Sequence, residues 1–390
     1  MNRLLILFFV SVVDLLGFGI VIPLLPYMGD SFGASPTEIT WILMSYGVCQ
    51  LVSAPIWGRL SDKFGRRPIL LFSFAGAGVS YLILGFSTTL WGLLLSRIIG
   101  GIMAGNISAL LAYAGDISTP ADRAKSLGTV GAAIGVGFML GPAIGGLLAG
   151  NDIQTANFVA PAIVAASLSL VAIGLVAFVL PESLTAEQRL AAAAMNQKES
   201  PLRLLARLPG LRRITIAALI VITAQAILES VTGLWALKRF NYGPMTVGLI
   251  LFGIALVAVI FQGGLIRVLA PRFGERRLAI AGAAAYTVGL MGIAVAPTFA
   301  WSIIGLAFCA AGQGLWQPSA SSLASQQSND GNRGAIMGTY QASSSLARVL
   351  GPAVSGPVFG AFGPSAPYAL ASVIAALAIL LLLRPLGTSS

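Results

Sequence analysis

The sequence has 390 residues, of which 57% are hydrophobic and only 9% are charged, with 23 Lys and Arg against 13 Asp and Glu. Soluble globular proteins have about 25% charged residues, so the composition excludes an ordinary soluble enzyme, a nucleic-acid-binding protein and a disordered chain. The sequence has no His, and its two cysteines, Cys49 and Cys309, lie within apolar runs. We therefore expect no disulfide framework, no metal site and no cofactor.

Apolar runs between charged or Pro/Gly-rich breaks predict an all-α membrane protein. Each membrane span takes about 20 apolar residues, so the chain is long enough for twelve spans with their loops. The predicted spans are 4–26, 38–58, 68–88, 90–113, 126–150, 157–180, 212–238, 244–268, 277–297, 299–324, 334–360 and 364–384. The first run is too long for a cleaved signal peptide, contains Asp14 and has no small-residue cleavage site after it.

Lys and Arg are distributed unevenly over the connections between these spans. One alternate set of connections carries nearly all of them, and the opposite set carries only Lys238 and Arg239. Because cytoplasmic loops are rich in Lys and Arg, we expect both termini to lie in the cytoplasm and the protein to reside in the cell (inner) membrane. The basic charge balance then reflects membrane topology, and no nucleic-acid partner is expected.

The two halves of the sequence resemble each other. Leu127-Gly-Thr-Val-Gly-Ala-Ala, followed by Leu140-Gly-Pro-Ala-Ile-Gly-Gly, has a counterpart 210 residues further on, in Met337-Gly-Thr-Tyr-Gln-Ala-Ser and Leu350-Gly-Pro-Ala-Val-Ser-Gly. A near-constant offset predicts two parallel six-helix repeats, a transporter architecture with its binding site at the repeat interface.

The domain boundaries follow from the one long polar segment, which contains a predicted short surface helix at 186–195. The expected parts are an N-terminal bundle at 1–180, a cytoplasmic linker at 181–211 and a C-terminal bundle at 212–390.

The connection Gly58-Arg-Leu-Ser-Asp-Lys-Phe-Gly-Arg-Arg-Pro68 is the most specific local motif. Together with Leu140-Gly-Pro142 and Pro181-Glu-Ser183, it resembles the signature set of the major facilitator superfamily. From Asp14-Leu-Leu-Gly-Phe-Gly-Ile-Val-Ile-Pro onward, the chain is most similar to the drug:proton antiporters of the tetracycline-resistance type. The resemblance implies twelve transmembrane helices in two pseudo-symmetric six-helix bundles, and we expect a monomer.

The resemblance also implies two sets of residues for the conformational cycle. The first is a charge relay that acts as a conformational latch, formed by Gly58, Asp62, Gly65, Arg66, Arg67 and Asp116. The second is a glycine-rich hinge in the fifth span, formed by Gly137, Gly141, Pro142, Gly145 and Gly146. Small residues at this spacing also permit close helix packing, and the two roles are compatible.

The sequence departs from the tetracycline pumps at their drug-handling residues. Those pumps carry an acid in the third span, where this chain has Gly78-Val-Ser-Tyr81. Their eighth-span His aligns near Ala258, and their ninth-span Asp aligns near Ala283 to Ala285. We therefore do not expect magnesium-chelated tetracycline to be the substrate.

Four ionisable residues lie well inside predicted spans, namely Asp14, Arg97, Glu229 and Arg348. Such residues are costly unless they face a partner or a cavity. Structural ion pairs are one interpretation. The other is proton coupling, in which a buried carboxylate takes up a proton on one side of the membrane and releases it on the other. In the family, the first-span Asp and the fourth-span Arg are both linked to transport.

Uncharged polar residues within the spans predict an amphiphilic substrate cavity. These residues are Tyr46, Gln50, Asn106, Gln225, Gln262, Gln313, Trp316, Gln317, Tyr340 and Gln341. Taken singly, each is as well explained as a contact between helices. Together they suit a lipophilic or amphiphilic organic molecule better than a sugar or an inorganic ion.

The sequence contains no Gly-x-x-x-x-Gly-Lys-Ser/Thr motif for its own ATPase, and we expect a transporter rather than an enzyme. The favoured hypothesis is proton-coupled efflux of lipophilic or amphiphilic organic compounds by alternating access. One alternative is transport of an anionic metabolite that binds Arg97 and Arg348. Another is a membrane scaffold with a transporter fold that does not transport.

Overall fold

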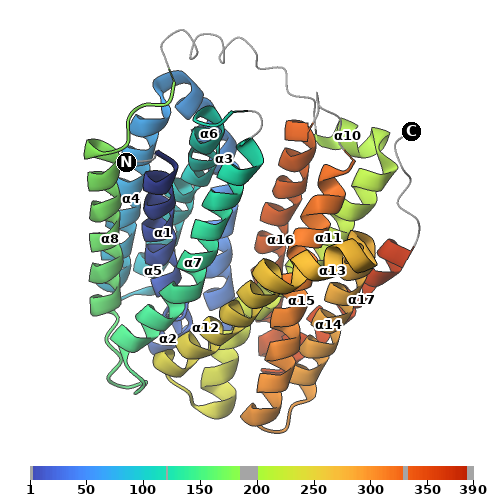
Figure 1. The fold of residues 1–390 in the computed structure, drawn as a ribbon. Coiled ribbons are helices and arrows are strands. Elements are labelled where there is room, and N and C mark those ends of the chain that lie inside the picture. Colours follow the sequence, from blue (N-terminus) through green and yellow to red (C-terminus); the bar gives the residue numbers. More distant parts are fainter. Residues whose placement is uncertain (1–2, 120–121, 185–200, 328–332, 384–390) are drawn as a thin grey trace. The chain divides into compact units, whose positions relative to one another are not determined.

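A computed structural model describes residues 3–119, 122–184, 201–327 and 333–383, and these residues form helices and no strand (Figure 1). The chain divides into two compact units. Unit 1 comprises Met1–Asn196 and Asn241–Phe252, and unit 2 comprises Gln197–Phe240 and Gly253–Ser390. The predicted parts and these units differ in two respects, because Asn241–Phe252 groups with unit 1 and the predicted linker at 181–211 is divided between the units after Asn196.

Each unit is built from long helices joined by short turns. Those of unit 1 are α1 (Arg3–Val21), α2 (Leu25–Ser31), α3 (Pro36–Phe64), α4 (Arg66–Gly85), α5 (Leu90–Met103), the 3₁₀ turn η1 (Ala104–Asn106), α6 (Ile107–Asp116), α7 (Arg123–Ala149) and α8 (Val159–Phe178). The others are α10 (Pro201–Arg207), α11 (Pro209–Phe240), α12 (Pro244–Ile260), the π-helical η2 (Phe261–Leu265), α13 (Ile266–Phe273), α14 (Glu275–Val295), α15 (Phe299–Ser325), α16 (Arg333–Phe362) and α17 (Ala366–Leu383). Of these, α12 runs from unit 1 into unit 2.

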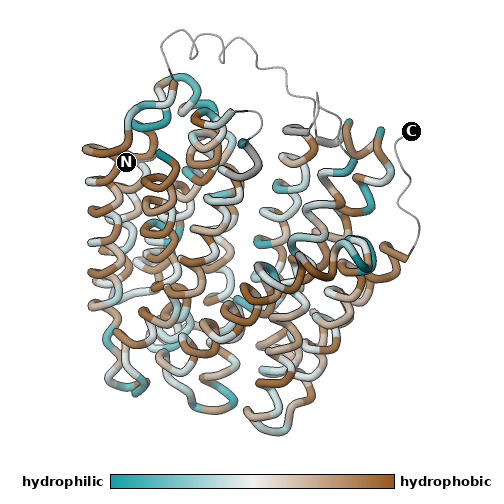
Figure 2. Tube along the Cα trace, in the orientation of Figure 1, coloured by the Kyte–Doolittle hydropathy of each residue, from teal (hydrophilic) through white to brown (hydrophobic). Residues whose placement is uncertain are grey.

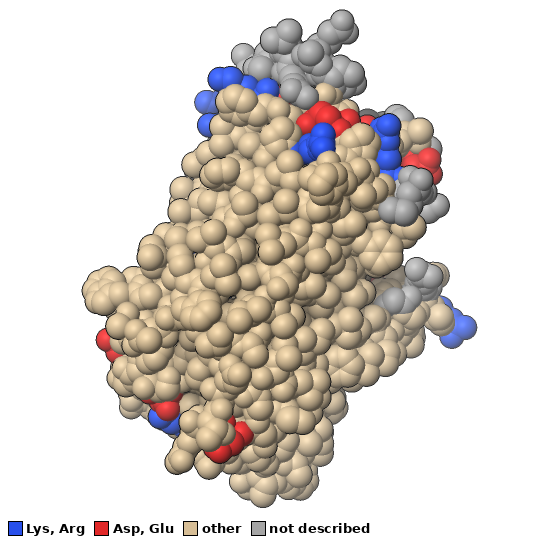
Figure 3. All heavy atoms as spheres, turned by 90° about the vertical axis from the view of Figure 1, so that its left-hand side faces the viewer, with Lys and Arg blue, Asp and Glu red and all other residues tan. Residues whose placement is uncertain are grey.

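Ten membrane-spanning candidates occur among the described residues, each long and apolar enough to cross a bilayer. The two further spans predicted from the sequence correspond to the 17-residue α12 with its continuation through η2 and α13, and to the 30-residue α16. Hydrophobic residues dominate along the helices (Figure 2). On the face of unit 1 in Figure 3, charged side chains gather towards the two ends and leave an uncharged zone between them. The prediction of an all-α membrane protein is confirmed.

The two units repeat the same order of helix packing. In unit 1, α1 packs against α7 and α8, and α4 packs against α5 and α8. In unit 2, α11 packs against α16 and α17, and α14 packs against α15 and α17. Glycines at equivalent positions permit the closest contacts, because a Cβ at Gly141 would lie 2.6 Å from Gly19 Cα and one at Gly351 would lie 2.5 Å from Ala226 Cβ. The internal repeat in the sequence is thus also a repeat of packing.

Several helix boundaries differ from the predictions. The first span ends at Val21, two residues before Pro23, and the chain then re-enters α2. Proline removes a backbone donor, so a long apolar run is not always one continuous helix. The fourth span is interrupted by η1, and the helix α10 was not predicted. The surface helix predicted at 186–195 lies outside the described residues.

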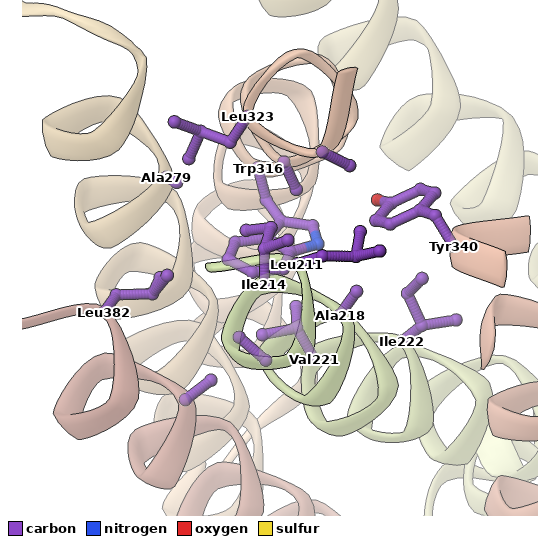
Figure 4. Packing of buried hydrophobic residues seen from close by; sticks show 14 of the residues in the cluster. Leu211, Ile214, Ala218, Val221, Ile222, Ala279, Trp316, Leu323, Tyr340 and Leu382 are labelled. Atoms are coloured by element: carbon purple, nitrogen blue, oxygen red, sulfur yellow. The ribbon is translucent and has the colours of Figure 1, made fainter. Parts of the chain in front are cut away.

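The core of unit 2 is a cluster of aliphatic and aromatic side chains between α11, α14, α15 and α16 (Figure 4). Leu211, Ile214 and Val221 of α11 pack there against Trp316 of α15. Large apolar residues on the outer faces remain exposed, as Phe178 does at 90%. In a membrane protein such faces contact lipid, since lipid tails are as apolar as the side chains.

Candidate functional site

Polar side chains from four helices and one 3₁₀ turn converge on a single small cavity within unit 1. Asp14 comes from α1, Tyr46 from α3, Tyr81 from α4, Arg97 from α5 and Asn106 from η1. The volume of the cavity is about 20 Å³, which is room for a water molecule but not for an organic substrate. The structure therefore brings together the acid and the base that the sequence places in the first and fourth spans.

Close packing between α3 and α5 positions Arg97 at this cavity. A Cβ at Gly101 would lie 2.9 Å from the Cβ of Cys49, so only glycine permits the approach. Arg97 lies one turn before Gly101 and hence on the same side of α5. On the neighbouring α4, the Ser80 hydroxyl donates to the carbonyl of Ser96 at 2.7 Å. These contacts hold the guanidinium group in the interior of the unit.

The Arg97 guanidinium is buried, but not all of its N–H groups have a hydrogen-bond acceptor. The residue is 2% exposed, its Nε donates to Ser96 Oγ at 3.4 Å, and its Cζ lies 5.8 Å from the centre of the Tyr46 ring. Its Nη2 has no acceptor among the described residues. An unsatisfied buried donor is costly, above all on a charged group, so this nitrogen is free to bind an anion, a water or an ionised carboxylate.

None of the four intramembrane charges forms an ion pair with a described residue. The ion pairs of Arg66 with Asp62 and Asp116 involve none of these four residues. Asp14 lies beside Asn106. In unit 2, Glu229 and Arg348 are exposed, and the Glu229 carboxylate accepts a 2.8 Å hydrogen bond from Gln225. Within each unit, the structure thus shows no direct ion pair for these four residues, and both interpretations stay predictions.

The turn between α3 and α4 forms a charge cluster around Arg66. The Arg66 Nη1 lies 2.6 Å from Asp62 Oδ1, and its Nε donates to Asp116 Oδ2 at 3.1 Å. Arg66 is 6% exposed, so these charge-assisted bonds lie mostly out of water and are stronger than surface pairs. Arg67 donates to the carbonyl groups of Val176 and Ala177 at the end of α8.

Glu182 and Ser183 also belong to this charge cluster, although the sequence did not predict their part in it. The Glu182 carboxylate accepts from the backbone N–H groups of Arg66 at 2.9 Å and Arg67 at 3.1 Å, and so caps the N-terminus of α4. The Ser183 hydroxyl donates to Asp116 Oδ2 at 2.8 Å. Both belong to the Pro181-Glu-Ser183 motif. The acid directly after a span could have indicated the role of Glu182, because a carboxylate is a suitable cap for a helix N-terminus.

The two glycines of the turn behave differently. Gly65 has a φ of +103° between α3 and α4, a conformation that other residues rarely adopt. Gly58, in contrast, is not at a close contact between helices, because the nearest atom to an added Cβ is Ser108 Oγ at 3.9 Å. Gly58 is thus a packing position that tolerates a methyl group.

The glycine-rich α7 is packed on two sides within unit 1. Towards α1, a Cβ at Gly137 would lie 2.5 Å from Leu15 Cβ, and one at Gly145 would clash with the carbonyl oxygen of Ile20. Towards the start of α12, a Cβ at Gly146 would lie 2.6 Å from the carbonyl oxygen of Pro244. From the side of α12, Gly248 lies close to the carbonyl group of Pro142. The predicted hinge residues are therefore at close-packed contacts, and their role as a hinge stays a prediction.

The predicted substrate-cavity residues are distributed over both units. Gln50 Nε2 donates to the carbonyl of Ala104 at 3.4 Å, beside the cavity of Asp14. In unit 2, Gln313 is half-buried, whereas Gln262, Gln317 and Gln341 are exposed.

Trp316 and Tyr340 require a correction. They were predicted to line the substrate cavity, but both rings pack within the hydrophobic cluster of unit 2, at 1% and 6% exposure (Figure 4). Their aromatic rings bury large apolar areas there, so packing explains their place in the spans.

The fold and the site define an integral membrane transporter. The model of the Major Facilitator Superfamily matches residues 7–328 and 265–389, and the chain belongs to this superfamily. It is 29% identical over 367 residues to the class C tetracycline resistance protein of Escherichia coli, covering 92% of this chain and 90% of that protein. It is also 29% identical to multidrug resistance protein 2 of Bacillus subtilis, over 89% of this chain and 86% of that protein. The crystal structure of the human organic anion transporter MFSD10 (TETRAN) has a TM-score of 0.73 and 24% identity, and the match covers 98% of this chain and 99% of that one.

Proposed function

We propose that this transporter exports lipophilic or amphiphilic organic molecules in exchange for protons, as a monomer in the inner membrane with both termini in the cytoplasm. The observation that carries the proposal is the cavity of unit 1, where Asp14 and Arg97 share one small space without an ion pair between them. A buried carboxylate beside a buried cation is a suitable group for taking up and releasing a proton.

The incomplete compensation of Arg97 supports a coupling mechanism. When Asp14 is ionised, its charge balances the guanidinium through a medium of low dielectric constant. When Asp14 is protonated, Arg97 loses this partner and its Nη2 has no substitute acceptor among the described residues. The two protonation states of Asp14 therefore favour different arrangements of the helices that line the cavity, which is the physical requirement for coupling.

The substrate class rests on chemistry and on similarity. The relatives include proteins named for resistance to tetracycline and to multiple drugs. The spans of this chain are mostly apolar with scattered amide groups, which suits amphiphilic compounds. The drug-handling acids and His of the tetracycline pumps are absent at Gly78-Val-Ser-Tyr81, Ala258 and Ala283, so tetracycline with magnesium is not the proposed substrate.

The cluster of Asp62, Arg66 and Asp116 supports a role as a conformational latch. Its ion pairs connect the start of α4 with the end of α3 and the end of α6. If these helix ends separate, both ion pairs break together. Because charge-assisted bonds contribute roughly 1.5–3 kcal/mol each, the cluster is strong enough to bias a two-state equilibrium.

Purified protein in pH-clamped proteoliposomes tests the proposal. Addition of an amphiphilic substrate to one side should release protons on that side, and Asp14→Asn should abolish this flux. Absence of substrate-induced proton flux across a panel of cationic, neutral and anionic compounds would refute proton antiport.

A second candidate is transport of an anionic metabolite, which the free Nη2 of Arg97 favours. It requires the cavity at Arg97 to widen during the transport cycle, since its volume in this structure is about 20 Å³. If the anion binds Arg97, then Arg97→Lys should weaken binding of anionic compounds and leave binding of neutral ones unchanged. Under proton antiport of amphiphiles, the same substitution should instead change the proton flux with every substrate.

A further inference from the structure

In unit 2, α13, α14 and α15 pack against one another (Figure 1). Residues of these three helices line an open cavity. Its volume is about 960 Å³, far larger than the cavity of Asp14. Apolar side chains of Phe273, Ile280 and Leu323 line it, together with the cations Arg276 and Arg277. Apolar walls combined with two guanidinium groups suit an amphiphilic anion.

The equivalent turn of unit 1, between α3 and α4, differs from the turn between α13 and α14 in its charged residues. Phe64-Gly65 corresponds to Phe273-Gly274 at an offset of 209 residues, and both glycines have positive φ, +103° and +77°. In unit 1, the carboxylates of Asp62 and Asp116 neutralise Arg66. At the same offset, or within one residue of it, Pro271 and Gln326 stand in place of these two acids, Glu275 stands in place of Arg66, and Arg276 corresponds to Arg67. Unit 2 therefore has one acid in this turn where unit 1 has two acids around its arginine.

Glu275 is the one acid among the residues that line the cavity of unit 2, and its carboxylate binds uncharged polar side chains. Glu275 accepts from Ser322 Oγ at 2.5 Å and from the side-chain amide of Gln326, and thereby ties α14 to α15. It forms no ion pair with any residue in the described part of the chain.

The two arginines have no carboxylate partner among the described residues. Arg276 donates to the carbonyl groups of Leu382 and Leu383 at the end of α17, at 2.9 Å each. Arg277 is exposed and forms no hydrogen bond or ion pair with a described residue. Arg277 is therefore the cation of this cavity that has no partner among the described residues.

We infer that this cavity binds the phosphate of an anionic phospholipid headgroup, with Arg277 as the main contact and Arg276 beside it. The acyl chains would extend over Phe273, which is 52% exposed, and over Ile280 and Leu323. Basic pockets between transmembrane helices at the membrane surface bind anionic headgroups in this way. The exposed apolar wall favours a lipid over a free phosphate, because a soluble anion gains nothing from it.

Retention of lipid by the purified full-length protein tests the inference. The protein is equilibrated with phosphatidylglycerol or with phosphatidylcholine in detergent, and bound lipid is counted by native mass spectrometry. We expect selective retention of phosphatidylglycerol, and a roughly fivefold loss of that retention in Arg277→Gln, since one arginine near an anionic headgroup contributes about 1 kcal/mol. Arg59→Gln is the matched control, because Arg59 is an exposed arginine of the corresponding cytoplasmic connection in unit 1, and it should retain lipid as the parent does.

A photoactivatable phosphatidylglycerol locates the site independently. Labelling of peptides that contain Phe273 or Leu323, reduced in Arg277→Glu, supports the inference. Equal retention of both lipids, or unchanged retention in Arg277→Gln, overturns it. Displacement of phosphatidylglycerol by inorganic phosphate at equal concentration also overturns it, because the occupant would then be a soluble anion. These outcomes do not depend on whether transport is coupled to protons.

Discussion

Arg66 and Asp116 are 50 residues apart in the sequence, yet Arg66 Nε lies 3.1 Å from Asp116 Oδ2. The bond joins the first turn of α4 to the last turn of α6, and Ser183 donates to the same carboxylate oxygen. The cluster therefore unites three separate stretches of unit 1.

The first prediction concerns this cluster. Arg66→Ala should slow transport by roughly tenfold or more while substrate affinity stays within twofold, because loss of charge-assisted bonds changes the equilibrium between conformations and not the binding site. Arg59→Ala, which removes an exposed arginine of the same connection, should transport normally. Parental turnover in Arg66→Ala would show that the cluster is not a latch.

The second prediction concerns the cap on α4. Glu182→Ala removes the acceptor for the N–H groups of Arg66 and Arg67, and we expect a loss of about 1 kcal/mol in stability. Glu182→Gln keeps an acceptor oxygen and should lose less. Thermal unfolding in detergent measures both variants, and equal melting temperatures for Glu182→Ala and the parent would contradict the assignment.

The third prediction separates the two candidate proton carriers. Asp14→Asn should abolish pH-driven accumulation of substrate and preserve substrate exchange, since the amide keeps the size of the side chain but carries no titratable proton. Glu229→Gln should have the smaller effect, because Glu229 is exposed in unit 2 and bonded to Gln225. Transport driven by a pH gradient, compared with counterflow at equal pH, distinguishes the two. Full pH-driven accumulation in both variants would exclude coupling through these groups.

The fourth prediction uses two glycines of the same helix. Gly141→Ala should destabilise the protein by about 1–3 kcal/mol and reduce transport, because the new methyl group overpacks the contact with α1. Gly135→Ala is the control, since no atom lies within 4 Å of a Cβ at that position. If both variants unfold at the same temperature and transport equally, the glycine contact between α1 and α7 has no energetic role.

The fifth prediction concerns substrate charge. We expect neutral and weakly anionic amphiphiles to be transported at least as well as cationic dyes, because the spans hold two acids and two arginines. Arg348→Ala should shift the preference towards cations, as surplus charge matters by several kcal/mol at low dielectric constant. Efflux of matched cationic and anionic compounds by both proteins measures the shift. A parental protein that strictly selects cations would contradict this expectation, whereas lower expression with unchanged selectivity would assign Arg348 to packing.

The sequence by itself determined the membrane class and the repeat, because both are properties of residue order. Long apolar runs leave no alternative to helices in a bilayer, and the match of Leu140-Gly-Pro with Leu350-Gly-Pro at a constant offset requires two similar units. The charged turn ending at Arg66 and Arg67 was equally recognisable, since its residue types and spacing are local. The residues of the charge cluster around Arg66 were therefore predictable except for Glu182 and Ser183.

Only the tertiary structure decided which intramembrane side chains meet. Asp14 and Arg97 lie 83 residues apart, and their meeting at one cavity depends on the rotation of α1 and α5 and on the glycine contact between α3 and α5. Trp316 and Tyr340 have the same polarity as cavity-lining residues, but helix rotation places both in the core of unit 2. Hydropathy along the sequence indicates that a residue lies in the membrane. The direction in which its side chain points is set by the packing of helices that are all apolar.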